Sequence, residues 1–127
     1  MIVGLGIDVA EVARIARLLE GPLAARFVAR VFTAGEAAYC DAVRDRATRY
    51  AARFAAKEAA FKALGVPEGI GYRDVEVVRG RGAPRLVLAG VAAEAARALG
   101  ARRVHLTLSH DAGVAVAAVI LEADANP

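Results

Sequence analysis

Apolar and polar positions divide the first third of the chain into a strand and three helices. Residues 1–9 are mostly apolar and end near Asp8, which is typical of a buried strand. Apolar side chains then recur twice at helical spacing. The first set is Val12, Ile15, Ala16 and Leu19, and the second is Leu23, Phe27 and Val31. Thr33 and Glu36 form a capping-box pattern that begins a third, short helix.

The longest predicted helix follows a polar break at residues 44–49 and includes the alanine-rich segment 53–65. Alanine, lysine, glutamate and leucine are good helix formers, and Phe54 and Phe61 fall on one face of this helix. Gly65, followed closely by Pro67, is a typical C-terminal stop.

Beyond this helix the pattern changes to the period of strands. The predicted elements are strands at 74–79 and 85–89, a helix at 91–99, a strand at 103–109, a turn at 110–113 and a strand at 114–121. The last strand is apolar throughout, which indicates burial on both faces or in an interface.

The order of these elements predicts an α+β fold with a mainly antiparallel sheet, a central long helix and several shorter helices. Residues 1–127 contain no linker, repeat or low-complexity segment, so we expect a single compact domain. No run is long and apolar enough for a membrane span and no signal peptide is visible, so we expect a cytoplasmic protein. Cys40 is the only cysteine, which excludes an internal disulfide.

Composition adds one feature to this picture. The net charge is only +3, but fifteen of the seventeen cationic side chains are arginine, the side chain best suited to phosphate and carboxylate groups. Both lysines, Lys57 and Lys62, bracket Glu58 on the central helix. The clustering suggests a need for a compact ammonium group. An ordinary exposed Glu58–Lys62 pair, worth about 0.2 to 0.5 kcal/mol, is the alternative.

Three further patterns carry alternative explanations. Gly4 and Gly6 lack the third glycine of a dinucleotide fingerprint, which disfavours a Rossmann site. Asp8 and Glu11 resemble a capping box at the start of the first helix. His110 lies at a predicted hairpin corner, where histidine usually caps a backbone group. The spacing of serine, histidine and aspartate gives no support for a protease triad.

Taken together, several segments resemble the holo-acyl-carrier-protein synthases, a family of small phosphopantetheinyl transferases. The resemblance covers nearly the whole chain and rests on residues 4–12, 53–59, 62–65, 69–77, 83–85 and 106–110. The departures are residues 66–68, where a short glycine-containing link is expected, and Thr107, where serine is usual.

This resemblance implies that the chain transfers the phosphopantetheine arm of coenzyme A to a serine of acyl carrier protein, for fatty acid biosynthesis. Asp8 and Glu58 match the family's Mg²⁺ ligands, and carboxylates are the ligands that Mg²⁺ prefers. Glu58 would activate the serine, directly or through metal-bound water, and Lys62 would stabilise the transferred phosphate. The nucleotide-binding candidates are Arg53, Lys57, Lys62, Gly65, Pro84, Ser109 and His110.

The resemblance also implies a homotrimer with active sites at subunit interfaces. Arg14, Arg26 and Arg30 are the expected docking cations for an acidic carrier protein. A basic nucleic-acid-binding module is an alternative, but it leaves Asp8, Glu58 and Lys62 unexplained and offers few aromatic side chains for base stacking. We expect neither nucleic acid nor membrane as a partner. Another Mg²⁺-dependent phosphate-transfer enzyme on the same fold is the third possibility.

Overall fold

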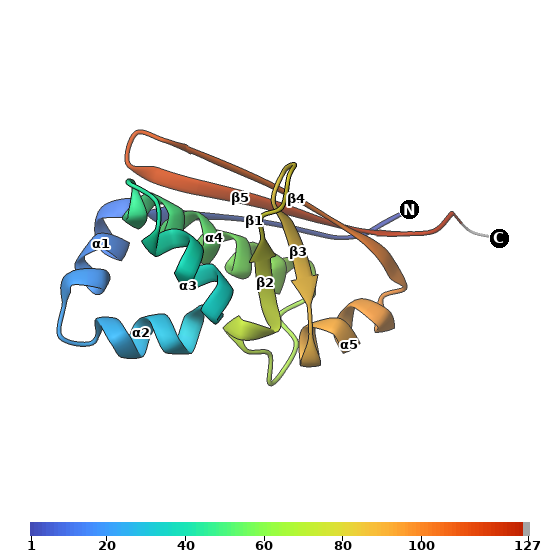
Figure 1. Ribbon diagram of the computed structural model, residues 1–127. Coiled ribbons are helices and arrows are strands. Elements are labelled where there is room, and N and C mark those ends of the chain that lie inside the picture. The colour runs from blue at the N-terminus through green and yellow to red at the C-terminus, as the bar shows by residue number, and fades with distance from the viewer. Residues whose placement is uncertain (126–127) are drawn as a thin grey trace.

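A computed structural model describes residues 1–125 (Figure 1). In chain order, the elements are β1 (Ile2–Glu11), α1 (Val12–Glu20), α2 (Ala24–Val31), α3 (Ala34–Asp41), α4 (Arg46–Ala63), the 3₁₀ turn η1 (Tyr72–Asp74), β2 (Val75–Val78), β3 (Arg85–Leu88), α5 (Gly90–Ala98), β4 (Ala101–Asp111) and β5 (Val114–Ala123). This arrangement confirms the predicted α+β class.

The strands form two antiparallel sheets. The larger sheet has the order β1-β5-β4, and β2 and β3 make a separate hairpin. Figure 1 shows α4 running along one face of the three-stranded sheet, with α2, α3 and the β2–β3 hairpin on the far side of the helix. The predicted central helix is therefore enclosed from both sides, and most of its alanines are fully buried.

The two glycines of β1 explain how closely α4 approaches the sheet. A Cβ atom on Gly6 would collide with the backbone carbonyl of Ala59, and one on Gly4 would collide with the carbonyl of Ala63. Glycine is required here because the helix backbone occupies the space that a side chain would need. The Gly-x-Gly pattern thus has a packing function.

Two buried charges pair between α3 and the alanine-rich α4. Lys57 and Glu36 are fully buried and form an ion pair of 2.7 Å between Nζ and Oε1. Glu36 also completes the predicted capping box, because its carboxylate accepts from the Thr33 N–H while the Thr33 hydroxyl accepts from the Glu36 N–H. The capping box at the start of α3 is confirmed, and its glutamate anchors α4 as well.

Two sequence predictions about element ends are wrong. The capping box expected at Asp8 does not form, because β1 continues to Glu11 and α1 begins only at Val12 without a side-chain cap. His110 does not lie at a hairpin corner: it is paired with Ala115 inside the β4–β5 ladder. Ala112 and Gly113, which both have positive φ, make the turn, as in a two-residue hairpin connection.

The sheet face opposite α4 is largely uncovered. On β1 it presents Leu5, Ile7 and Val9, which are exposed by 66%, 58% and 58%. In register with them stand Ile120, Ala118 and Val116 on β5, and His105, Thr107 and Ser109 on β4. The apolar run of β5 is thus buried against α4 on one face and only partly covered on the other.

Candidate functional site

The predicted catalytic residues meet where β1 crosses α4. Gly4 lies against Ala63 and Gly6 against Ala59, so two residues along the strand match four along the helix. These are equal rises of about 6 Å. Asp8, two residues beyond Gly6 on the same face, is therefore level with the turn of α4 that contains Glu58. The strand and the helix therefore place Asp8 at the level of this turn, although the two residues are 50 positions apart in the sequence.

Lys62 is tied to the strand and not to its own helix. Its Nζ lies 3.0 Å from Asp8 Oδ1 and donates to the backbone oxygen of Ile7 at 3.0 Å. The side chain of Asp8 is 19% exposed and that of Lys62 is 52% exposed. The alternative of an i,i+4 pair between Glu58 and Lys62 is therefore wrong, since the ion pair that this ammonium makes is with Asp8.

Glu58 has a partner that the sequence did not suggest. The Tyr72 hydroxyl donates to Glu58 Oε1 at 2.7 Å. Burial, followed by this hydrogen bond, raises the pKa of Tyr72 to about 12, so the phenol is a neutral donor. The charge of Asp8 also raises the pKa of Tyr72, and the charge of Arg14 lowers it, both by less than burial and the Glu58 hydrogen bond do.

The donor set here suits a hard cation with few protein ligands. Asp8 and Glu58 offer carboxylate oxygens, which Mg²⁺ prefers, and Mg²⁺ commonly takes only one or two protein carboxylates beside phosphate and water. Among residues 1–125 no group of three or more histidine, cysteine, aspartate or glutamate side chains could hold a metal ion. The chemistry of the two carboxylates therefore fits Mg²⁺ bound together with a phosphate-bearing substrate.

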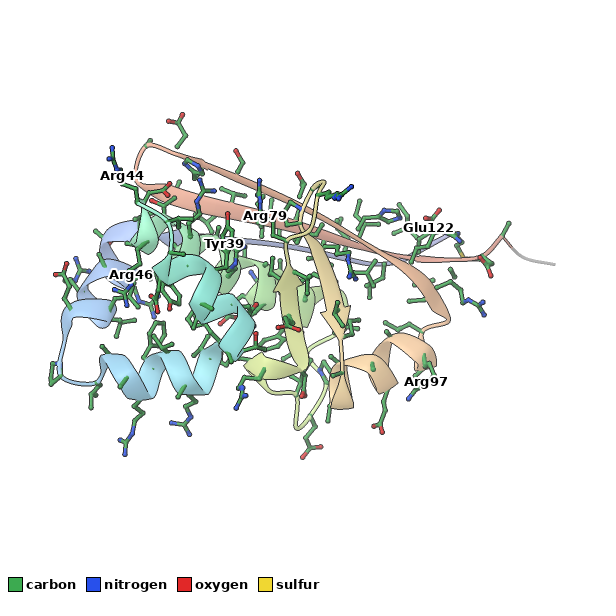
Figure 2. All side chains as sticks on the ribbon, in the orientation of Figure 1. Tyr39, Arg44, Arg46, Arg79, Arg97 and Glu122 are labelled. Atoms are coloured by element: carbon green, nitrogen blue, oxygen red, sulfur yellow. The ribbon has the colours of Figure 1, made fainter. Side chains whose placement is uncertain are left out.

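A separate cleft of about 290 Å³ gathers four of the predicted nucleotide-binding residues. Arg53, Pro84, Ser109 and His110 all line it. Arg49 and Arg79 line it too, so it contains three guanidinium groups. Arg79 follows β2, and it lines a smaller neighbouring cavity together with Tyr39; both side chains are labelled in Figure 2. A cleft with this lining suits a phosphorylated ligand.

Arg53 is the buried member of this set. It is 3% exposed, its guanidinium lies 4.3 Å from the centre of the Tyr39 ring, and within the described chain its Nε has no hydrogen-bond partner. A buried donor without a partner is uncommon. Stacking on Tyr39 fixes the orientation of the planar group, and Arg53 lines both this cleft and a smaller cavity that Tyr39 also lines.

Other predicted residues lie elsewhere. Lys57 is fully buried, and its Nζ donates to Glu36 and to the backbone oxygens of Tyr72 and Val75. All three of its N–H groups are thus engaged inside the protein. Gly65 has φ of +81° and ends α4 as predicted.

The predicted docking cations lie away from the cleft. Arg14 on α1 and Arg26 and Arg30 on α2 are exposed. No helix in the described part of the chain has the length and apolar character needed to span a membrane.

The chain as a whole belongs to a known class of protein. Residues 4–118 match the family model of the 4'-phosphopantetheinyl transferase superfamily, and the chain belongs to this family. Within it, the chain is similar to the holo-[acyl-carrier-protein] synthase of Anaeromyxobacter dehalogenans strain 2CP-1. The two are 71% identical over 124 residues, which are 96% of this chain and 97% of the relative. The resemblance seen in the sequence is confirmed.

Solved structures agree. The fold is similar to that of Helicobacter pylori holo-[acyl-carrier-protein] synthase in complex with coenzyme A, with a TM-score of 0.79 and 29% identity over 93% of this chain and 99% of that one. It is also similar to the Bacillus anthracis holo-(acyl-carrier-protein) synthase in complex with CoA (3',5'-ADP). That match has a TM-score of 0.78 and 34% identity over 98% of this chain and 99% of the other.

Proposed function

We propose that this chain transfers the 4'-phosphopantetheine group of coenzyme A to a serine of apo acyl carrier protein, for fatty acid biosynthesis. The observation that carries the proposal is the Asp8–Lys62 ion pair at the crossing of β1 and α4, beside the turn of α4 that contains Glu58, in a chain of this family. The products are holo carrier protein and adenosine 3',5'-bisphosphate.

The chain's own residues account for the proton and the phosphate charge. The serine oxygen attacks the phosphorus that bears pantetheine, the bond from this phosphorus to the bridging oxygen breaks, and adenosine 3',5'-bisphosphate leaves with that oxygen. Glu58 accepts the serine proton, directly or through a water molecule. Lys62, which is exposed enough to reach a ligand, stabilises charge on the transferred phosphate.

Mg²⁺ is the metal we assign to this site, with Asp8 and Glu58 as its protein ligands. When bound, it would neutralise phosphate charge and orient the pyrophosphate. Lys62 Nζ lies 3.0 Å from Asp8 Oδ1 and compensates the charge of this carboxylate.

The arginine-lined cleft is the proposed site of the nucleotide. Arg49, Arg53 and Arg79 supply positive charge to its lining, and Pro84, Ser109 and His110 line the same space. Lys57 stays in the nucleotide set only as an indirect contributor, because its ammonium is buried in the ion pair with Glu36. Gly65 contributes an exposed backbone at the end of α4, in a conformation with positive φ.

The assembly we propose is a homotrimer of single-domain subunits, residues 1–127, in the cytoplasm. The uncovered apolar face of the larger sheet supports it, because Leu5, Ile7 and Val9 stand exposed together on β1. Contiguous exposed apolar surface of this kind is typical of subunit interfaces. The arginines of α1 and α2 would dock the acidic carrier protein by charge.

The direct test is a mass measurement. Apo carrier protein incubated with the enzyme, coenzyme A and Mg²⁺ should gain the mass of one phosphopantetheine group, and a carrier whose acceptor serine is replaced by alanine should gain nothing. Omitting Mg²⁺ in the presence of a chelator should prevent the gain. An unchanged carrier mass under complete conditions would refute the proposed function.

A further inference from the structure

Tyr72 is hydrogen-bonded to one oxygen of Glu58, the proposed catalytic carboxylate. Its hydroxyl donates to Glu58 Oε1 at 2.7 Å. A carboxylate has two oxygens with about four lone-pair directions between them. This bond therefore restricts rotation of the Glu58 carboxylate and leaves Oε2 as the oxygen that is not held by Tyr72.

The ring of Tyr72 is itself held by aromatic neighbours. It stacks on Phe54 with ring centres 5.7 Å apart and planes tilted by 21°, and it packs on Phe61 with centres 5.0 Å apart. Both phenylalanines come from α4, the helix that carries Glu58. Phe54 precedes Glu58 in the helix and Phe61 follows it. Their contacts with the Tyr72 ring hold its hydroxyl against Glu58.

The backbone of the same residue is anchored in the core. Its carbonyl oxygen accepts from Lys57 Nζ at 3.0 Å, and Lys57 is fixed by the buried ion pair with Glu36. Glu36 Oε2 accepts in turn from the N–H of Val77 at 2.8 Å. Lys57 thus links the η1 turn to α3 and α4, which gives this buried lysine a role at the site without ligand contact.

From these contacts we infer that Tyr72 is a positioning residue: its hydroxyl fixes Glu58 Oε1 so that Oε2 is presented to the reacting groups. The inference rests on the proposed function, because it assigns Tyr72 a role through Glu58 in that reaction. Partners that orient a functional carboxylate commonly change activity or metal affinity by about 10- to 100-fold when removed.

The alternative is that Tyr72 only fills space between Phe54 and Phe61. Tyr72→Phe separates the two roles, because it retains the ring and its aromatic contacts and removes only the hydroxyl. Tyr50→Phe is a matched control. Tyr50 is fully buried, and its hydroxyl lies 3.0 Å from a carboxylate oxygen of Asp41, but neither residue belongs to the proposed site.

We expect Tyr72→Phe to lower kcat by about 10-fold or more, with the Michaelis constants for coenzyme A and carrier protein changed less than twofold. Tyr50→Phe should keep the wild-type kcat. A second readout uses the protein alone: the ¹³C resonance of the Glu58 carboxyl should shift in Tyr72→Phe and stay in place in Tyr50→Phe. The melting temperatures of both variants show whether either substitution destabilises the fold.

If the wild-type enzyme modifies carrier protein, any of three results would overturn the inference. Tyr72→Phe could keep the wild-type kcat, or its only change could be a raised Michaelis constant for coenzyme A. Alternatively, Tyr72→Phe and Tyr50→Phe could lose kcat equally. Failure of the wild-type enzyme to modify carrier protein would refute the proposed function instead, so the two failures are distinguishable.

Discussion

Gly6 of β1 and Ala59 of α4 are in direct backbone contact, and the Ala59 carbonyl oxygen occupies the place of a Cβ atom on Gly6. This contact sets the distance between the strand that carries Asp8 and the helix that carries Glu58 and Lys62. The packing of two small residues therefore determines the geometry of the proposed catalytic group.

Gly6→Ala should both destabilise the protein and impair transfer. The added methyl group must push α4 away from β1, and overpacking of this kind costs about 1 to 3 kcal/mol. Denaturant unfolding measures the loss of stability, and kcat measures the displacement of Asp8 from Glu58. Gly80→Ala is the control, because a Cβ atom there meets nothing within 4 Å. Equal stability of the two variants would contradict the close approach.

Asp8→Asn and Glu58→Gln should each reduce Mg²⁺-dependent transfer by about 100-fold or more, because each removes a negative oxygen that binds metal or accepts the proton. The free energy of unfolding should change by about 1 kcal/mol or less, since the Asp8–Lys62 pair is partly exposed. Kinetics across a Mg²⁺ titration, with urea unfolding in parallel, make the measurement. Asp124→Asn, which breaks an exposed ion pair with Arg103, is the matched control.

Wild-type turnover in either site variant would remove that residue from the proposed site. A large loss of stability would instead show that the carboxylate mainly supports the fold.

The sequence predicted local structure well because the signals are local. The Thr33–Glu36 capping box and the stop at Gly65, with φ of +81°, each depend on a few adjacent residues. Asp8 and Glu11 match the capping-box pattern equally well, but they do not begin a helix. They remain in β1, because this strand pairs with β5 as far as Glu11. Tertiary pairing overrides a local cap of about 1 kcal/mol.

Long-range partners were harder to predict. Lys62 lies four residues after Glu58, but its ion pair reaches Asp8, 54 positions away, because the glycines of β1 let α4 lie directly on the strand. No sequence pattern indicated that Tyr72 would contact Glu58. A tyrosine in a turn gives no indication of its hydrogen-bond partner until the turn is placed over α4.

Glu122 should titrate far below an ordinary glutamate. Hydrogen bonds from His105 and then from Arg103 lower the pKa of Glu122 from 4.5 to about 2. Because the folded pKa is the lower one, this group favours the folded state fully above pH 4.5, and the contribution disappears as pH falls towards 2. A ¹³C NMR titration should place its midpoint near 2 in the wild type and higher in His105→Ala. Midpoints near 4.5 in both proteins would refute this network.

Ile7→Lys should dissociate the proposed trimer. Ile7 is 58% exposed in the single chain, between Leu5 and Val9 on the uncovered sheet face, and a lysine there would place a charge in an apolar interface. Sedimentation velocity should give about three times the chain mass for the wild type and the chain mass for the variant. Leu99→Lys replaces another partly exposed aliphatic side chain, at the end of α5, and should leave the trimer intact. A monomeric wild type would contradict the assembly.

Charge reversal on α1 and α2 tests carrier docking. If Arg14, Arg26 and Arg30 steer an acidic carrier protein, replacing all three by glutamate should raise the Michaelis constant for the carrier about 10-fold or more, with that of coenzyme A little changed. Arg14 also acts on Tyr72, so the pair Arg26 and Arg30 should be reversed separately to isolate docking from the site.

Salt provides the control within the same experiment. At ~0.15 M ionic strength the screening length is about 8 Å, so added salt should slow the wild type more than the charge-reversed enzyme. The arginines of α2 are exposed, which makes them sensitive to screening. If neither the reversals nor salt alters the carrier's Michaelis constant, the carrier docks on another surface. A steep, salt-dependent loss of nucleic-acid binding would favour the nucleic-acid module over docking.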